Sequence, residues 1–193
     1  MTVGIVGLGL IGGSMAKSIK ARTAHTVFGC DLDQETMMMA RMCGAIDAPL
    51  TAENLKDCDL VLVAIRPAAA VKWVKEHAEG IRRDTILVDL CGVKRTVVAA
   101  IAPIAEERGF SYIGGHPMAG REFSGFRYAK DDLFDRASMI LTPPRDAGPE
   151  VLTWLKDFFL TIGFRRVQFT TPREHDEMIA YTSQLAHVVS SAY

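Results

Sequence analysis

The stretch "GIVGLGLIGGSMA", residues 4–16, decides the fold of this chain. Its first residues continue an apolar strand that begins at Thr2, and Gly7, Gly9 and Gly12 then form the spacing G-x-G-x-x-G where a helix begins. A strand, a glycine turn and a helix in this order are typical of the first βαβ unit of a dinucleotide-binding fold.

Each glycine of this motif has its own physical role. Gly7 permits a tight turn, Gly9 lets the backbone approach a pyrophosphate, and Gly12 allows the helix and the strand to pack closely. The pyrophosphate lies at the N-terminus of the helix, where Leu10 and Ile11 follow Gly9. We therefore expect these five residues to bind a dinucleotide.

Asp31 ends the second expected strand, 26–31, and follows Gly12 by 19 residues. A carboxylate at this place accepts hydrogen bonds from the adenosine ribose hydroxyls and repels a 2′-phosphate. The next residues, "LDQE", offer no Arg or Lys to bind such a phosphate. The sequence thus favours NAD over NADP as the cofactor, and a helix cap or turn residue is the alternative role for Asp31.

Strand and helix patterns alternate along the rest of the chain. The expected strands are 2–6, 26–31, 59–65, 85–90, 110–114, 138–142 and 164–170, and the expected helices are about 12–22, 34–44, 67–80, a segment after Lys94, and 150–162. Nearly continuous apolar runs are typical of strands that are covered on both faces. The alternation predicts an α/β fold of the Rossmann type, with a doubly wound, mostly parallel sheet.

The segment after residue 170 has a different pattern. Thr171 to Glu174 form a capping box with Pro172 at the first helical position, and a helical pattern continues from there to Tyr193. One side of this helix is an apolar stripe that needs a cover. We expect residues 1–170 to be one domain. Residues 171–193 are expected to begin an all-α second domain that is missing or supplied by another chain, and that forms a homodimer.

The composition limits the class of protein. The chain has 193 residues, 49% of them hydrophobic, and a formal net charge of −1, which gives no basic surface for nucleic acid or an anionic membrane. No apolar run approaches the ~20 residues of a membrane span. The N-terminus lacks a signal peptide's basic region, and the four cysteines lack metal-ligand spacing. We expect a cytoplasmic protein without a metal, acting on a small-molecule substrate.

Two further charged positions fall at expected strand ends. Asp89, with the loop 91–95, and Arg66 both lie at the carboxyl edge of the sheet, where ligands bind in open α/β folds. Each is either a ligand contact or a solvated charge, and Arg66 is counted among the candidate cofactor-binding residues.

An NAD-dependent oxidation needs a group that handles the proton of the alcohol, and His is suited to this because its pKa lies near neutrality. Of the five histidines, we select His116, in the glycine-rich stretch "YIGGHPMAGREFSGF", and His187. His187 lies four residues after Ser183, and both share one helical face with Asp176. The alternatives are an ordinary turn at His116 and a solvated polar side of the last helix.

Five stretches, "GLGLIGGS", "DLCGVK", "HPMAGREFSG", "LFDRASMILTP" and "HDEMIAYTSQLAH", carry a resemblance that covers nearly the whole chain. They resemble the prephenate dehydrogenase family, which includes arogenate and cyclohexadienyl dehydrogenases. The resemblance implies NAD-dependent oxidative decarboxylation of prephenate to 4-hydroxyphenylpyruvate, in the tyrosine branch of aromatic amino acid synthesis. It implies that His116 accepts the proton of the ring hydroxyl, and that Ser183, Gln184 and His187 face substrate and nicotinamide. The same chemistry on arogenate and a non-catalytic NAD-binding fragment are the alternatives.

The sequence departs from the family pattern in three places. Gly92 stands where a Ser commonly precedes Val-Lys and contacts the substrate and the catalytic His. The "SHLPH" of the last helix reads "SQLAH" at 183–187. The Arg that typically pairs with the ring carboxylate lies beyond Tyr193, so we expect the chain as given to bind NAD and to catalyse poorly.

Overall fold

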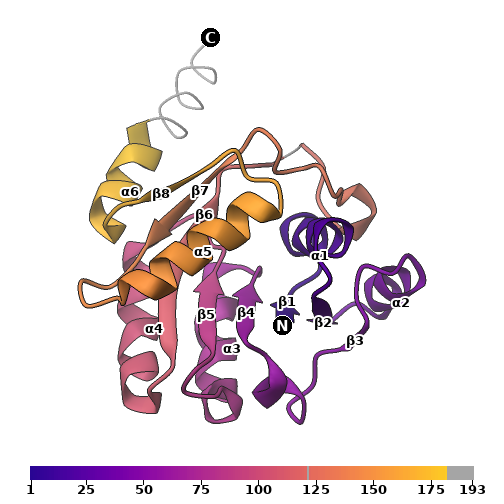
Figure 1. Ribbon diagram of the computed structural model, residues 1–193, viewed down its shortest axis with the longest axis horizontal. Coiled ribbons are helices and arrows are strands. Elements are labelled where there is room, and N and C mark those ends of the chain that lie inside the picture. Colours follow the sequence, from indigo (N-terminus) through magenta and orange to yellow (C-terminus); the bar gives the residue numbers. More distant parts are fainter. Residues whose placement is uncertain (121, 182–193) are drawn as a thin grey trace.

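The computed structural model describes residues 1–120 and 122–181, and a single eight-stranded sheet forms its centre (Figure 1). The strands are β1 (Thr2–Val6), β2 (Thr26–Cys30), β3 (Ala48–Pro49), β4 (Leu60–Val63), β5 (Ile86–Asp89), β6 (Ser111–Pro117), β7 (Ser138–Thr142) and β8 (Arg166–Phe169). They lie in the order β3-β2-β1-β4-β5-β6-β7-β8, and every neighbouring pair is parallel except β6 and β7. The predicted Rossmann-type sheet is confirmed.

Helices cover both faces of the sheet (Figure 1). Those in the described part of the chain are α1 (Leu10–Arg22), α2 (Gln34–Met42), α3 (Pro67–His77), α4 (Arg95–Arg108), α5 (Pro149–Thr161) and α6 (Pro172–Ile179), with 3-10 turns at Leu55–Asp57, Ala78–Gly80 and Phe126–Tyr128. Buried side chains of α1, α2 and α5 share one apolar core with the sheet, and those of α3 and α4 share another. These two cores explain the continuous apolar run of β4, which is covered on both faces.

The turn between β1 and α1 depends on two glycines. Gly7 has a φ of +85°, a conformation in which any side chain is strained. A Cβ at Gly12 would overlap the carbonyl oxygen of Gly7, so α1 approaches β1 only because position 12 has no side chain. A Cβ at Gly9, by contrast, would meet no atom within 4 Å. Gly9 therefore leaves open space beside the N-terminus of α1.

The sequence predicts a loop around His116, but the structure places this residue in a strand. It is the sixth residue of β6 and pairs with Ile140 of β7. Gly114 and Gly115 also belong to the strand, and a Cβ at either would collide with neighbouring strands or α4. The strand extends past the expected 110–114 because antiparallel pairing with β7 satisfies the backbone of residues that have no apolar periodicity.

Two further features lie at one edge of the sheet and at the start of the last described helix. The two-residue strand β3, which pairs with β2 at the sheet edge, is not predicted by the sequence pattern. Helix α6 begins at Pro172 behind the predicted capping box, with Thr171 and Glu174 bonded reciprocally. The continuation of the expected helix over residues 182–193 lies outside the described residues.

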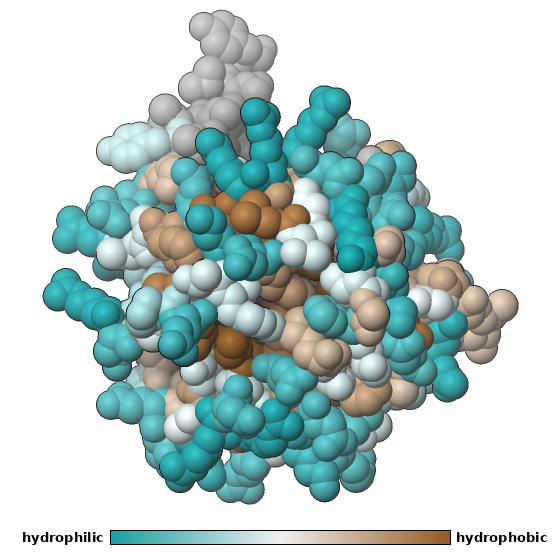
Figure 2. Space-filling view, in the orientation of Figure 1, coloured by the Kyte–Doolittle hydropathy of each residue, from teal (hydrophilic) through white to brown (hydrophobic). Residues whose placement is uncertain are grey.

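Figure 2 shows the molecular face that carries α5. Hydrophilic side chains cover most of it, and hydrophobic ones remain visible near its centre. Trp154 and Leu160 of α5 and Phe169 of β8 are among the large hydrophobic side chains left exposed. Single exposures of this kind are ordinary on a globular protein. In the part of the chain that the structure describes, no helix is long and apolar enough to cross a membrane.

Replacing Gly12 by Ala should destabilise the protein by about 1–3 kcal/mol or more, because the new methyl group forces α1 away from β1. Gly9→Ala is the matched control in the same loop, and we expect it to lower the free energy of unfolding by less than Gly12→Ala does, because a Cβ at position 9 meets no atom within 4 Å. Urea denaturation of both variants measures the difference. Equal stability of the two variants would contradict the packing role of Gly12.

Candidate functional site

The N-terminus of α1 lies at the carboxyl edge of the sheet, directly after β1. The first helical bond runs from the Gly13 N–H to the Gly9 carbonyl at 2.9 Å, so the N–H groups of Leu10 and Ile11 have no partner within the helix. The first turn of α1 carries no acidic side chain. Together with the open space at Gly9, these N–H groups fit the pyrophosphate of a dinucleotide.

Asp31 connects the glycine loop to the end of β2. Its Oδ2 accepts the N–H of Leu8 at 2.7 Å, and its Oδ1 accepts the N–H of Asp33 at 3.0 Å. Asp33 is the residue that caps α2, so Asp31 is a turn residue rather than a helix cap. Because a carboxylate offers about four lone-pair positions, Asp31 can still accept hydrogen bonds from ribose hydroxyls.

Arginine side chains approach this end of the sheet from two elements. Arg66 is exposed at the N-terminus of α3 and follows Ile65, whose side chain packs close to Gly7. Arg127 lies 4.0 Å from Glu35 of α2. Both side chains of this pair are exposed, so the ion pair is weak.

A second group of side chains, the Lys94 cluster (Asp89, Lys94, Tyr112, His116, His175 and Asp176), lies where β5 and β6 end. Asp89 and Lys94 form an ion pair in which both side chains are 0% exposed. The Lys94 Nζ also donates to the Gly115 carbonyl at 2.6 Å, and the Tyr112 hydroxyl donates to Asp89 Oδ2 at 2.8 Å. Interpreting Asp89 as a solvated strand-end charge is therefore wrong, because its neighbours in β6 and the 91–95 loop bury it.

Tyr112 remains a donor in this cluster. Burial, followed by the negative charge of Asp89, raises the pKa of its phenol far above the ordinary value. The phenol therefore stays protonated, and the Asp89 carboxylate has donors on both of its oxygens. The hydrogen bond between Tyr112 and Asp89 joins the end of β5 to β6 and so fixes the strand that carries His116.

His116 is half-buried at the end of β6. Burial, followed by nearby His175 and Lys94, lowers the pKa of His116 to about 4, so the imidazole is neutral near pH 7. Its Nδ1 lies 2.8 Å from the Nε2 of His175. A Cβ added at Gly92 would stand 3.7 Å from its Nε2, so this nitrogen faces the loop that follows β5.

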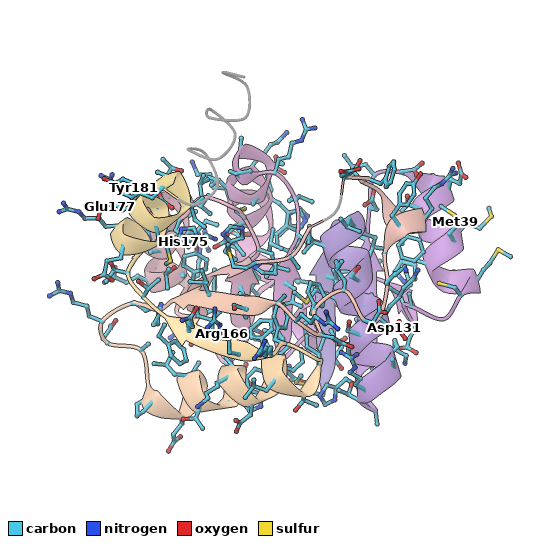
Figure 3. The ribbon with its side chains drawn as sticks, turned by 90° about the horizontal axis from the view of Figure 1, so that it is seen from above. Met39, Asp131, Arg166, His175, Glu177 and Tyr181 are labelled. Carbon is cyan, nitrogen blue, oxygen red and sulfur yellow. The ribbon has the colours of Figure 1, made fainter. Side chains whose placement is uncertain are left out.

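His175 and Asp176 of α6 complete the cluster. His175 is 0% exposed, and its Nδ1 lies 2.7 Å from Asp176 Oδ1. The Asp176 carboxylate also accepts the backbone N–H groups of Lys94 at 2.8 Å and Arg95 at 3.0 Å. Figure 3 shows His175 on the inner side of α6, whereas Glu177 of the same helix lies on the outer side.

The sequence predicted part of this cluster and missed part of it. His116 is predicted, but His175 is not, since a His in the first turn of a helix gives no sign of burial. The capping box was the usable signal, because it fixes where α6 begins and therefore which side of the helix residue 175 occupies. The predicted substrate-facing residues Ser183, Gln184 and His187 lie outside the described residues.

The glycine loop and the Lys94 cluster lie on the same edge of the sheet. Strands β1 and β6 both run toward this edge and are separated by β4 and β5. Three strand spacings amount to roughly 14 Å. A dinucleotide whose pyrophosphate lies at α1 extends along this edge. The arrangement can therefore hold a cofactor at one end and present the other end to His116.

The fold and the glycine loop define a dinucleotide-binding domain of the Rossmann class. Residues 15–168 match the family model described as prephenate dehydrogenase, nucleotide-binding domain. The chain therefore belongs to the prephenate dehydrogenase family.

Known relatives match the chain over nearly its whole length. It is 31% identical over 195 residues to the prephenate dehydrogenase of Bacillus subtilis, covering 99% of this chain and 52% of that protein. It is 28% identical over 191 residues to the cyclohexadienyl dehydrogenase of Zymomonas mobilis, covering 97% of this chain and 64% of that protein. The chain thus spans about half to two thirds of the length of these curated relatives.

Solved structures give the same result. The crystal structure of prephenate dehydrogenase from Aquifex aeolicus, in complex with hydroxyphenyl propionate and NAD+, matches with a TM-score of 0.89 and 29% identity. The crystal structure of Synechocystis arogenate dehydrogenase matches with a TM-score of 0.87 and 29% identity. Each match covers 100% of this chain and 67% of the other chain.

Replacing Lys94 by Met should destabilise the protein by about 3–5 kcal/mol, because the buried Asp89 charge loses its partner. Adding Asp89→Asn to this variant should recover part of the loss, since no unpaired charge then remains. The free energy of unfolding in urea measures both effects. A loss of less than about 1 kcal/mol for Lys94→Met would contradict the buried pair.

Proposed function

We propose that this chain is the cofactor-binding part of an NAD-dependent enzyme that converts prephenate to 4-hydroxyphenylpyruvate by oxidative decarboxylation. The observation that carries this proposal is the neutral His116, whose Nε2 faces the loop after β5 on the same sheet edge as the glycine loop. Membership of the family supports the choice of substrate.

In the proposed reaction, His116 Nε2 takes the proton of the substrate's ring hydroxyl while the carbon that bears this hydroxyl loses a hydride. The chemistry that NAD supplies when bound is acceptance of that hydride. The new ketone is conjugated with the two ring double bonds, so it draws the electron pair of the bond between the opposite ring carbon and its carboxylate into the ring, and CO2 leaves because the product is aromatic. His116 then returns its proton to the phenolate oxygen and ends the reaction neutral.

The surroundings of His116 suit this role. Its low pKa keeps the base form available at neutral pH. The ion pair of Lys94 and Asp89 holds the end of β6 in place, which limits the positions that the imidazole can take. The glycine loop and Asp31 support binding of the pyrophosphate and the adenosine ribose at the other end of the cofactor.

The choice between prephenate and arogenate is open to experiment. The two substrates differ at the side chain, where arogenate carries an amine and prephenate a ketone. The residues predicted to face the substrate on the last helix, Ser183, Gln184 and His187, lie outside the described residues. The homodimer through residues 171–193 and the cytoplasmic location remain predictions from the sequence.

The protein expressed from the complete reading frame should form NADH with prephenate. His116→Asn should lower kcat by roughly 10²–10⁴-fold, the contribution of a general base, with NAD affinity nearly unchanged. His77→Phe, at the far end of α3, is the control and should keep full activity. Turnover of His116→Asn within a few-fold of wild type would overturn the role of His116, and absence of turnover with either substrate would indicate a non-catalytic NAD-binding protein.

The same assay tests the ionisation of His116. Because the base must be unprotonated and its pKa is lowered to about 4, kcat should stay constant as the pH falls through 6.5 and should decline only as it approaches 4. The measurement is kcat against pH with both substrates saturating. A decline centred near the ordinary histidine pKa would contradict the burial of this imidazole.

Asp31 should make the 193-residue chain bind NAD more tightly than NADP, because its carboxylate repels a 2′-phosphate. Asp31→Asn removes the charge but keeps an oxygen for the N–H of Leu8, so it should narrow the difference between the two cofactors. Lys72→Gln, at an exposed position of α3 where Lys72 pairs with Glu76, is the control and should leave the preference unchanged. Calorimetric titration with both cofactors gives the Kd values, and tighter binding of NADP to wild type would contradict the assignment.

A further inference from the structure

Asp176, His175 and His116 form a continuous line of hydrogen bonds from α6 to β6. Asp176 Oδ1 lies 2.7 Å from His175 Nδ1, and His175 Nε2 lies 2.8 Å from His116 Nδ1. The two imidazole rings meet edge to face, with centroids 5.0 Å apart. Since His175 is 0% exposed, both of its ring nitrogens depend on these protein partners rather than on bulk water.

Asp176 is the fixed end of this line. Partial burial acts to raise its pKa, but hydrogen bonds from the Arg95 N–H, the His175 ring and the Lys94 N–H outweigh that effect, and the pKa is lowered. Asp176 is therefore ionised at neutral pH. An ionised carboxylate can only accept hydrogen bonds, so the proton between Asp176 and His175 belongs to His175 Nδ1.

The ionised Asp176 determines where the protons lie on the imidazole rings of His175 and His116. When His175 carries a single proton, that proton lies on Nδ1 beside Asp176, and its Nε2 can only accept. The bond between the rings is then donated by Nδ1–H of His116. Because His116 is neutral at this pH, it has no second proton, and its Nε2 presents a free lone pair toward the loop at Gly92.

We infer that His175 and Asp176 are positioning residues that hold His116 as the Nδ1–H tautomer, so that Nε2 is the nitrogen that accepts the substrate proton. The inference rests on the role proposed above for His116. The opposite arrangement has His175 protonated on both nitrogens and donating to His116, which places the His116 proton on Nε2 and removes the base. A partner that fixes the reactive tautomer of a catalytic imidazole is a recurring device in enzymes.

The hydrogen bonds at the start of α6 place His175 beside His116. Thr171 Oγ1 accepts the Glu174 N–H at 3.2 Å, Glu174 accepts the Thr171 N–H at 3.1 Å, and the His175 N–H donates to the Thr171 carbonyl at 2.9 Å. Arg173 and Glu177 lie in exposed positions of the same helix and pair with each other at 2.8 Å. The burial of His175 is therefore a property of its position and not of the helix as a whole.

Nitrogen-15 NMR of the histidine side chains tests the tautomer directly on the 193-residue chain at neutral pH. The coupling pattern between ring nitrogens and ring protons identifies which nitrogen of His116 carries the proton, and His116→Asn assigns the signal. We expect the Nδ1–H form of His116 in wild type. A predominant Nε2–H form would overturn the inference, whether or not the chain is catalytically active.

Two variants of His175 separate positioning from simple packing. His175→Gln places an amide oxygen near the former Nε2, so it should keep His116 in the Nδ1–H form. His175→Phe keeps a ring of similar size but offers no acceptor, so the Nε2–H form should become populated. His77→Phe, which removes an imidazole that stacks on Trp73, is the control for loss of one histidine and should leave the His116 signal unchanged. An unchanged His116 tautomer in His175→Phe would also overturn the inference.

The kinetic consequence is measured on the protein from the complete reading frame. His175→Phe should lower kcat by about tenfold or more, within the range that general-base assistance contributes, and should leave the KM for prephenate within a few-fold. His175→Gln should restore most of the lost kcat. If wild type has no turnover, the proposed function fails while the NMR result still decides the tautomer. If His175→Phe turns over at the wild-type rate, His175 has no positioning role.

Discussion

The buried ion pair between Lys94 and Asp89 is the interaction on which the geometry of the site depends. Lys94 bonds the end of β5 through Asp89 and the strand β6 through the Gly115 carbonyl, and its own backbone N–H bonds Asp176 of α6. Removing two charges from water is costly, and only a complete set of partners offsets that cost. Tyr112 supplies one of these partners, so the pair specifies a single arrangement of the three elements around His116.

The glycine loop and the Lys94 cluster, at the two ends of the sheet edge, differ in the kind of group that forms the site. At the glycine loop, the groups that face a ligand belong to the backbone, and the role of Gly9 and Gly12 is to keep side chains away. At the Lys94 cluster, the groups that matter are buried side chains whose charges and protons are set by one another. A backbone site tolerates changes in most neighbouring side chains, whereas a network of buried polar side chains works only when every member is present.

Helix α6 belongs to this site although it lies late in the chain. Asp176 bonds to the backbone of residue 94, 82 positions earlier, and His175 bonds to His116, 59 positions earlier. These contacts close the open edge of the cluster and bury His175. The segment from Thr171 onward therefore acts in two ways, as a support for the backbone where α4 begins and as the partner of the His116 ring.

The sequence by itself determined the features that rest on short-range spacing. Gly7, Gly9 and Gly12, the strand before them, Asp31 at the end of the next strand, and the capping box at Thr171 are all encoded within a few residues or one βαβ unit, so their physical reasons can be read locally. The alternation of apolar runs and helical patterns likewise gave the order of layers, because each run must be covered on both faces.

Only the tertiary structure decided which polar residues are buried and what they contact. Asp89 and Lys94 look like ordinary strand-end charges in sequence, and His175 looks like a polar residue in a helix start, yet all three are 0% exposed. His116 became part of a strand only because β7 pairs with it from residue 140. A buried polar group is stable only with its partners, and those partners come from elements far apart in the chain, so no local pattern specifies them.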